Sequence, residues 1–278
     1  MKKTEINSSH KRLDSKAVLV TRARAQAEEM TVLLEGLGAN VIHVPTIEFI
    51  APDDLAPLDN ASRRLEEYDW IIFTSSNAVD FFIQRLRENL IAGVAVLGTR
   101  SICAIGTATA RALKQAGIRA NVVALESTSE GVLRELIERI GGQGIMRELK
   151  ILIPRAKVAR EILPSRLRDL GAHVDVVETY QTVLPQITRT SLKKLFEETR
   201  IDVITFTSSS TVSNLATLLG LTDLSDVLKS ALVACIGPVT AETARKFGLT
   251  NIVQPVVYTA AELVRAIATA IGEQRNKK

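Results

Sequence analysis

Short apolar runs without polar alternation recur along the chain, and each is followed by a segment with helical spacing. The runs are AVLV, WIIF, ICAI, KILI and DVITF, which begin at positions 17, 70, 102, 150 and 202. Strands that are buried on both faces of a parallel sheet lack alternation, so these runs predict such strands. After ICAIG, the stretch TATARALKQAGI has apolar residues at helical intervals and places Gly117 where a helix ends. The alternation predicts an α/β fold with open parallel sheets flanked by helices.

The same pattern occurs twice. The run IIFTSSNAV at 71–79 returns as ITFTSSSTV at 204–212, and VLVTR at 18–22 returns as ILIPR at 151–155, both 133 residues further on. Similarly, AIGTATARALKQAGI at 104–118 corresponds to CIGPVTAETARKFGL at 235–249, and STSEGVLRELI at 127–137 corresponds to YTAAELVRAIA at 258–268. Four matches in the same order indicate a duplicated unit, and therefore two similar α/β domains.

Length and composition agree with two domains and exclude several classes of protein. The 278 residues, 46% of them hydrophobic and 24% charged, are enough for two separate cores. No apolar run reaches the roughly 18 residues of a membrane-spanning helix, and the N-terminus lacks the apolar centre of a secretion signal. The two cysteines, Cys103 and Cys235, lie within apolar runs, which favours buried free thiols and a cytoplasmic location. Residues 1–15 are polar, and we expect a disordered tail there.

Metal and nucleic-acid chemistry receive little support. The three histidines, His10, His43 and His173, have no ligand spacing, so we expect no metal site. The net charge of +4 is mild and aromatic residues make up 4% of the chain, so the stacking platforms of single-strand binders are mostly missing. The sequence also lacks a P-loop and a nucleophile elbow. A small anionic ligand fits this composition better than a nucleic acid.

Hydroxyl and basic groups gather where the predicted strands end. The candidate anion-binding residues at these positions are Arg22, Ser75, Ser76, Asn77, Thr107, Thr109, Arg155, Ser208, Ser209 and Thr240. The carboxyl ends of parallel strands share one rim of a sheet, and the free amides and dipole at each helix start favour an anion there. A structural interpretation also exists, because Ser and Thr are preferred helix caps and an Arg after a strand is often a solvated charge. The presence of these features in both copies favours the ligand role, since two facing rims would form a cleft for a large polyanion.

Seven motifs together carry a resemblance to a known family. VLVTR, FTSSNAV, AIGTATA, ILIPRA, ETYQT, FTSSSTV and CIGPVTAETA resemble the uroporphyrinogen-III synthase family over about residues 17–271. The resemblance implies a cofactor-free hydro-lyase that closes the linear tetrapyrrole hydroxymethylbilane with inversion of ring D. Each pyrrole of that substrate carries an acetate and a propionate. The resemblance further implies a monomer without nucleic-acid or membrane partners, in transient contact with the preceding enzyme of the pathway.

The resemblance also implies where the domains begin and end. One domain would comprise residues 16–49 plus 184–278 and the other residues 50–183, joined by a two-stranded linker within PTIEFIAPDD and TYQTVLPQIT. In that arrangement the VLVTR strand shares a sheet with the second-half motifs. The ILIPR strand then shares a sheet with the first-half motifs.

Tyr180, in ETYQT, matches the tyrosine of the family and is the candidate catalytic residue. We expect it to donate a hydrogen bond or a proton to the departing hydroxyl. The alternative is a linker tyrosine that only packs over the hinge. A different class of function also remains open, namely a non-catalytic, hinge-bending sensor of an anionic metabolite, in which the hydroxyl-lined rims act only as a clamp. Ligand-induced closure without turnover would support that alternative.

Overall fold

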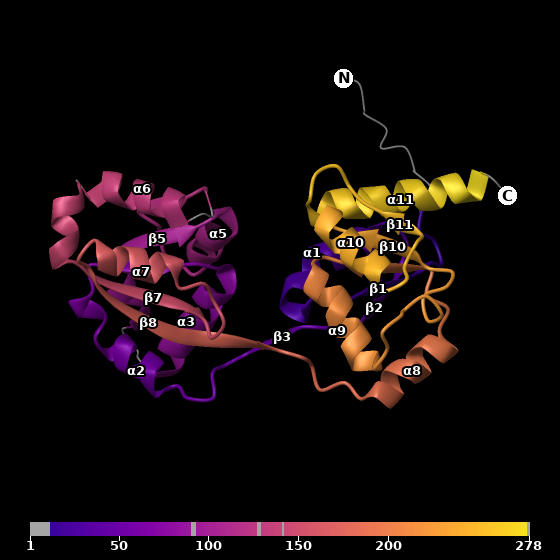
Figure 1. Ribbon diagram of the computed structural model, residues 1–278, viewed down its shortest axis with the longest axis horizontal. Helices are drawn as coiled ribbons and strands as arrows, with labels where there is room; N and C mark the ends of the chain where they lie inside the picture. The colour runs from indigo at the N-terminus through magenta and orange to yellow at the C-terminus, as the bar shows by residue number, and fades with distance from the viewer. Residues whose placement is uncertain (1–11, 90–92, 127–128, 141, 277–278) are drawn as a thin grey trace, which may run out of the picture. The chain divides into compact units, whose positions relative to one another are not determined.

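The computed structural model describes residues 12–89, 93–126, 129–140 and 142–276. The chain divides into two compact units: unit 1 is Met1–Glu48 with Val183–Lys278, and unit 2 is Phe49–Thr182. It passes between the units twice, within β3 (Glu48–Ile50) and at the end of β8 (His173–Val183), as Figure 1 shows. These two strands are hydrogen-bonded neighbours, which confirms the expected two-stranded link.

Unit 1 contains a five-stranded parallel sheet in the order β11-β10-β9-β1-β2. Its strands are β1 (Ala17–Val20), β2 (Asn40–His43), β9 (Val203–Phe206), β10 (Leu232–Cys235) and β11 (Ile252–Val253). β1 lies beside β9, with Leu19 opposite Ile204. The prediction that VLVTR shares a sheet with second-half motifs is therefore confirmed.

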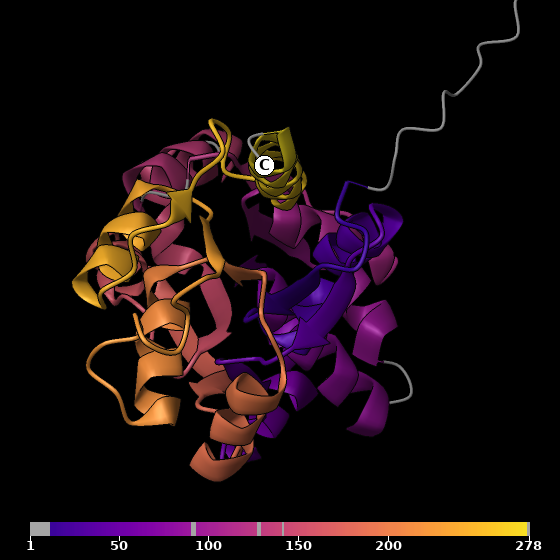
Figure 2. The ribbon, with the colours of Figure 1, turned by 90° about the vertical axis from the view of Figure 1, so that its right-hand side faces the viewer.

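Helices cover both faces of this sheet, because its strand residues alternate between two apolar clusters. Val18 and Val20 pack with α1 and α11, whereas Leu19 packs with α8, α9 and α10. Figure 2 shows α11 and the pair α8 and α9 on opposite sides of the strands. The helices are α1 (Arg24–Gly36), α8 (Arg189–Glu198), α9 (Ser209–Leu219), α10 (Pro238–Lys246) and α11 (Ala260–Asn276).

Unit 2 contains a six-stranded sheet in the order β3-β8-β7-β4-β5-β6. The pairings from β8 through β6 are parallel, and β7 lies beside β4 with Ile151 opposite Trp70. The predicted pairing of ILIPR with first-half motifs is thus also confirmed. Besides β3 and β8, the strands are β4 (Trp70–Phe73), β5 (Ser101–Ile105), β6 (Val122–Ala124) and β7 (Lys150–Ala156).

The two faces of this second sheet are covered by different sets of helices. Ile71 and Phe73 face a cluster with α2, α3, α4 and α5, while Trp70 and Ile72 face α6, α7 and η2. Figure 1 shows α6 and α7 on one side of the strands and α2 and α3 on the other. The helices are α2 (Ala56–Arg63), η1 (Leu65–Glu67), α3 (Ser76–Asn89), α4 (Gly93–Gly98), α5 (Thr107–Gln115), α6 (Ser129–Ile140), η2 (Gln143–Glu148) and α7 (Ile162–Asp169).

The strand order reverses at one point in each sheet. In unit 1 the reversal lies between β1 and β9, and in unit 2 it lies between β7 and β4. The helices that follow the two strands of each pair cover opposite faces of the sheet, α1 and α9 in unit 1 and α7 and α3 in unit 2. Such a switch point leaves a crevice at the carboxyl ends of the strands, where ligands of open α/β sheets bind.

One prediction about the N-terminal region requires correction. Residues 12–15 form a turn, whose Leu13 is fully buried and donates its N–H to the carbonyl of Leu37 at 3.0 Å. These four residues are therefore not part of a disordered tail, because burial of Leu13 beneath α1 and α11 anchors them. The remainder of the predicted tail, residues 1–11, lies outside the described residues.

The prediction of buried free thiols is confirmed. Cys103 and Cys235 are both free and buried. Burial raises the pKa of each thiol to about 12, which keeps both side chains protonated and unreactive at neutral pH.

Candidate active site

In unit 2, the segment after β4 begins the candidate site. Ser75 directly precedes α3, and its Oγ accepts a hydrogen bond from the backbone N–H of Ala78 at 3.1 Å. The cap interpretation of this serine is therefore correct, although the side chain is only half-buried. Ser76 and Asn77 form the first turn of α3 and are half-buried as well.

Tyr180 lies next to this helix start. Its hydroxyl is 3.2 Å from Oγ of Ser75, and either oxygen can be the donor. The ring stacks on Phe81 at a centroid distance of 5.7 Å and meets the edge of Phe49 at 5.6 Å. Tyr180 is 8% exposed. The two aromatic neighbours, which the sequence analysis missed, hold the phenol ring with its oxygen directed at Ser75.

A β-bulge in β8 sets the direction of Tyr180. Arg155 of β7 lies opposite Glu178, but the next residue lies opposite Tyr180, so Thr179 is an extra residue in β8. Regular alternation would place Tyr180 on the same face as Val176, which packs with α6 and α7. The bulge instead turns Tyr180 toward the cluster that contains α3. The hydroxyl of buried Thr179 donates to the carbonyl of Arg155 at 3.1 Å and so stabilises the bulge.

The turn after β5 contains the second hydroxyl group of this rim. Gly106 has a φ of +82°, a conformation that L side chains rarely adopt. Thr107 follows it as the exposed first residue of α5, whereas Thr109 is 2% exposed. Thr240, which corresponds to Thr109 in unit 1, is 4% exposed. On the GTAT turn, Thr107 therefore offers a ligand far more surface than Thr109.

Arg155 is the penultimate residue of β7 and is 8% exposed. Its Nη1 donates to the carbonyl of Arg160 at 3.1 Å, and its Nη2 forms an ion pair with Glu161. Burial, together with the nearby positive charge of Arg168, lowers the pKa of the guanidinium, which is charged at neutral pH all the same. The alternative interpretation, a solvated surface charge, does not hold at this position, because the segment between β7 and α7 contacts the side chain and covers it.

In unit 1, Ser208 and Ser209 lie at the start of α9. Ser208 forms a capping box with Thr211, and Oγ of Ser209 donates to the carbonyl of Val239 at 3.3 Å. Both serines are half-buried. The two rims therefore use the same device, a serine cap after the strand at the switch point, with partly accessible hydroxyls.

Arg22 follows β1 on the same rim of unit 1. It is half-buried, its Nε donates to Oε1 of Gln26 at 3.2 Å, and burial lowers the pKa of its guanidinium. Next to it, the buried hydroxyl of Thr21 donates to the carbonyl of Thr205 at 2.6 Å. This cross-strand contact, which the sequence analysis missed, fixes β1 against β9 directly below Arg22.

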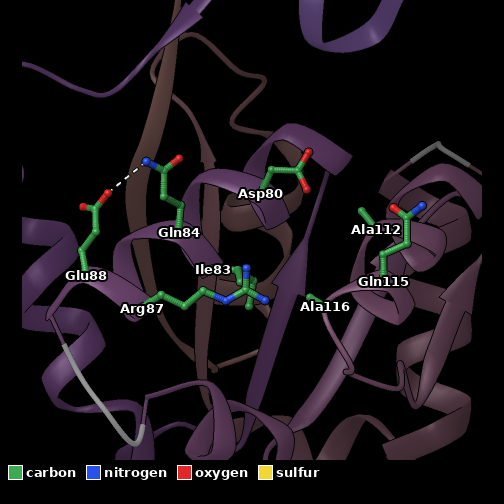
Figure 3. A pocket seen from close by; sticks show the side chains of 8 residues that line it. All are labelled: Asp80, Ile83, Gln84, Arg87, Glu88, Ala112, Gln115 and Ala116. Atoms are coloured by element: carbon green, nitrogen blue, oxygen red, sulfur yellow. Dashed lines mark hydrogen bonds between the residues drawn. The ribbon is translucent and has the colours of Figure 1, made fainter. Parts of the chain in front are cut away.

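A large surface hollow lies elsewhere in unit 2. Its volume is about 530 Å³. Figure 3 shows its lining side chains, several of them polar, on α3 and at α5. Gln84 and Glu88, two of its lining residues, bind each other at 2.9 Å. Its walls contain none of the predicted site residues, and we assign it no ligand.

The described residues contain neither a metal-binding cluster nor a membrane-spanning helix. Among these residues, no group of three His, Cys, Asp or Glu side chains is placed to hold a metal ion. No helix in the described part of the chain has the length and apolar character that crossing a membrane requires.

Comparison with known proteins identifies the family. The family model described as "Uroporphyrinogen-III synthase HemD" matches residues 28–265. A protein of Methanothermobacter thermautotrophicus is 34% identical over 259 residues, which cover 91% of this chain and 98% of that protein. The uroporphyrinogen-III synthase of Synechococcus elongatus is 32% identical over 92% of this chain and 95% of its own. The crystal structure of uroporphyrinogen-III synthetase from Helicobacter pylori has the same fold, with a TM-score of 0.59 at 17% identity over 92% of this chain and 99% of that one. The chain therefore belongs to the uroporphyrinogen-III synthase family.

Proposed function

We infer that this protein closes hydroxymethylbilane to uroporphyrinogen III, with loss of water and inversion of ring D. It is a lyase of tetrapyrrole biosynthesis. The observation that carries this conclusion is the family match over residues 28–265, together with relatives that align over nearly their whole length. The same match disfavours the alternative of a non-catalytic sensor.

The substrate supplies most of the reactivity in this reaction. Electron donation from the pyrrole nitrogen expels the hydroxyl of the hydroxymethyl group, which leaves as water once it has gained a proton, and an azafulvene remains. The substituted carbon of ring D attacks the azafulvene and gives a spiro-pyrrolenine. This intermediate fragments and closes again with ring D inverted, and loss of a proton restores the pyrrole. The protein has to fold the chain and hold it in the reactive geometry, which is catalysis by positioning.

Tyr180 is the residue that we propose to assist the departing hydroxyl. A phenol can donate a hydrogen bond or a proton to the leaving oxygen in the transition state. The contact with Ser75 at 3.2 Å and the two flanking phenyl rings support this role, because they fix the direction of the phenolic oxygen. In this proposal Ser75 is a positioning residue for Tyr180.

The acetate and propionate groups are proposed to bind at the rims of the two sheets. The proposed binding residues are Arg22, Ser75, Ser76, Asn77, Thr107, Thr109, Arg155, Ser208, Ser209 and Thr240. Their placement at strand ends and helix starts supports the proposal, since backbone amides at a helix start favour a carboxylate. For the nearly buried Thr109 and Thr240, we expect the contribution to come through the backbone of their helix turn.

The proposal extends to the organisation of the protein. We propose domains at residues 16–49 with 184–278 and at residues 50–183, in a cytoplasmic monomer that contacts the preceding enzyme of its pathway only transiently. Family membership and the division of the chain into two compact units support this arrangement. Small-angle scattering with and without substrate would measure both the mass and any closure.

Isomer analysis tests the activity. The purified protein is incubated with freshly generated hydroxymethylbilane, and the product is oxidised and separated into its isomers. Uroporphyrin III in excess over a control without protein is the expected result. Formation of the type I isomer alone, which is the spontaneous product, would refute the function.

A further inference from the structure

The carboxyl rim of unit 2 contains a pocket of about 400 Å³ beside the switch point between β7 and β4. Most of its wall is apolar, and its charged groups are two arginines and one glutamate. The apolar side chains include Ile105, Ile153 and Leu163, and the charged ones are Glu130, Arg155 and Arg160. A wall of this kind suits a flat apolar ring that carries an acidic substituent.

Arg155 is the buried charge of this pocket, and its hydrogen bonding is incomplete. Nη1 and Nη2 are engaged by the carbonyl of Arg160 and by Glu161. Nε is buried, and within the described part of the chain it has no hydrogen-bond partner. A buried donor without an acceptor is unusual in a folded protein, and a missing ligand is one physical reason for it.

Glu161 reaches the guanidinium from the surface. Its side chain is 60% exposed, whereas that of Arg155 is 10% exposed. Nε–H and Nη2–H lie on the same edge of a guanidinium and form the fork that binds a carboxylate through two hydrogen bonds. Glu161 accepts a hydrogen bond from Nη2 but none from Nε. A carboxylate that bound both nitrogens would therefore displace Glu161, which can return to water at little cost.

We propose that this pocket is a carboxylate subsite in which Glu161 occupies Arg155 in the free protein and a ligand carboxylate takes its place. The identity of the ligand rests on the proposed function: one pyrrole ring of the linear tetrapyrrole lies between the apolar walls, and its acetate or propionate binds Nε and Nη2 of Arg155. Glu161 is a positioning residue, which keeps the guanidinium directed into the subsite until the substrate arrives.

Two substitutions with opposite expected effects test the subsite. The probe is a single pyrrole that carries one propionate, and its dissociation constant is measured by calorimetric titration at low ionic strength. Arg155→Met is expected to weaken binding roughly tenfold, because the fork is lost. Glu161→Gln is expected to tighten binding about threefold, because the competing charge is lost. A purely structural ion pair predicts no gain in affinity for Glu161→Gln.

Glu178→Gln is the matched control. Glu178 is exposed and lies opposite Arg155 in the strand register, and its charge acts on the same guanidinium. It does not line the pocket. This substitution removes one negative charge near Arg155 without freeing the fork, so the dissociation constant of the probe is expected to change by less than about twofold. Circular dichroism checks the fold of each variant. If Arg155→Met does not fold, the probe affinity of Glu161→Gln alone tests the subsite.

Either of two results would overturn the subsite: unchanged or weaker probe binding by Glu161→Gln, or full probe binding by a folded Arg155→Met variant. The isomer assay, run on the same preparations, separates the two proposals. If only the type I isomer forms while the probe still responds to both substitutions, the proposed function fails and the subsite remains. If the type III isomer forms and the probe ignores both substitutions, the subsite alone fails.

Discussion

The phenolic oxygen of Tyr180 lies 3.2 Å from the hydroxyl oxygen of Ser75, although 105 positions separate these residues in the chain. The contact joins the last residues of unit 2, just before the chain passes into unit 1, to the helix start that follows β4. A bulge of one residue at Thr179 makes it possible. The proposed acid is therefore fixed by the helix cap on one side and by strand geometry on the other.

Tyr180→Phe removes the hydroxyl and leaves the ring between Phe49 and Phe81. We expect kcat for formation of the type III isomer to fall by about a hundredfold, because assistance to the leaving hydroxyl is lost. The free energy of unfolding is expected to change by less than about 1 kcal/mol, since the ring stacking is kept. Unchanged turnover would remove Tyr180 from the catalytic role and leave it as a packing residue.

Tyr68→Phe is the matched control for that experiment. Tyr68 is also a buried tyrosine of unit 2, and its hydroxyl donates to Oδ2 of Asp175 at 2.6 Å. Burial and this carboxylate raise the pKa of Tyr68 far above its ordinary value. The pair lies at the amino-terminal side of the sheet, away from the rim that carries Tyr180. Its loss is expected to lower stability by about 1 to 2 kcal/mol and to leave kcat unchanged.

Ser75→Ala removes two contacts of the serine hydroxyl, the cap on the backbone N–H of Ala78 and the contact with the hydroxyl of Tyr180, and their effects can be measured separately. Loss of the cap on α3 is expected to lower the free energy of unfolding by about 1 kcal/mol, as for other N-cap serines. Loss of the contact with Tyr180 is expected to reduce kcat as well, but only while the tyrosine hydroxyl is present. A double-mutant cycle with Tyr180→Phe measures this coupling. Additive effects on kcat would mean that Ser75 does not position Tyr180.

Much of the fold could be predicted because duplication repeats the signal. A single run such as WIIF predicts a buried strand, but its partner remains open. When the same strand, turn and helix occur twice, the two copies indicate equivalent positions in two sheets, and the family resemblance then predicts that the VLVTR strand shares a sheet with second-half motifs. The register, with Leu19 opposite Ile204, follows only from the structure, because β1 is apolar throughout and β9 has Thr205 as its one polar residue, so no alternation fixes the pairing.

The site was less accessible to sequence reasoning. No residue pattern around Tyr180 indicates that Thr179 is an extra strand residue, because a bulge depends on the partner strand rather than on local composition. Phe49 and Phe81 come from distant segments, so their contact with Tyr180 is tertiary. Burial of Arg155 depends on how the segment before α7 folds over it. The sequence did offer one signal of an ion pair at Arg155, namely the acidic residue Glu161 six positions later.

Gly106→Ala tests the turn that begins α5. No atom lies within 4 Å of where the new Cβ would stand, so the cost comes from the φ of +82° alone. With a ψ of 158° this backbone lies in a region that is almost exclusive to glycine, so we expect the free energy of unfolding to fall by about 1 to 3 kcal/mol, and KM to rise because Thr107 shifts with the turn. Gly98→Ala, which also meets no atom within 4 Å and has no positive φ, is the control and is expected to keep stability within about 0.5 kcal/mol. Equal losses in both variants would contradict the backbone explanation.

Asp59 of α2 binds Arg85 of α3 through two contacts of 2.8 Å, from Nε to Oδ1 and from Nη2 to Oδ2. Hydrogen bonding from Arg85 holds the pKa of this carboxyl below its ordinary value. Because the folded-state pKa is the lower one, the stabilisation is complete above the unfolded-state pKa of about 4 and is lost as the pH falls through the folded-state value. Asp59→Asn is therefore expected to lower the free energy of unfolding by about 1 kcal/mol at neutral pH and by less near pH 3.

Urea unfolding at both pH values measures this difference, with Glu67→Gln as the control. Glu67 pairs with Arg64 at 3.0 Å, but both side chains are about half exposed, at 43% and 52%. Solvent screens such a pair, so its removal is expected to leave the urea midpoint unchanged within experimental error at either pH. An Asp59→Asn effect of the same size at neutral pH and near pH 3 would show that the loss comes from altered packing between α2 and α3. The charge of Asp59 would then contribute nothing measurable to the stability of unit 2.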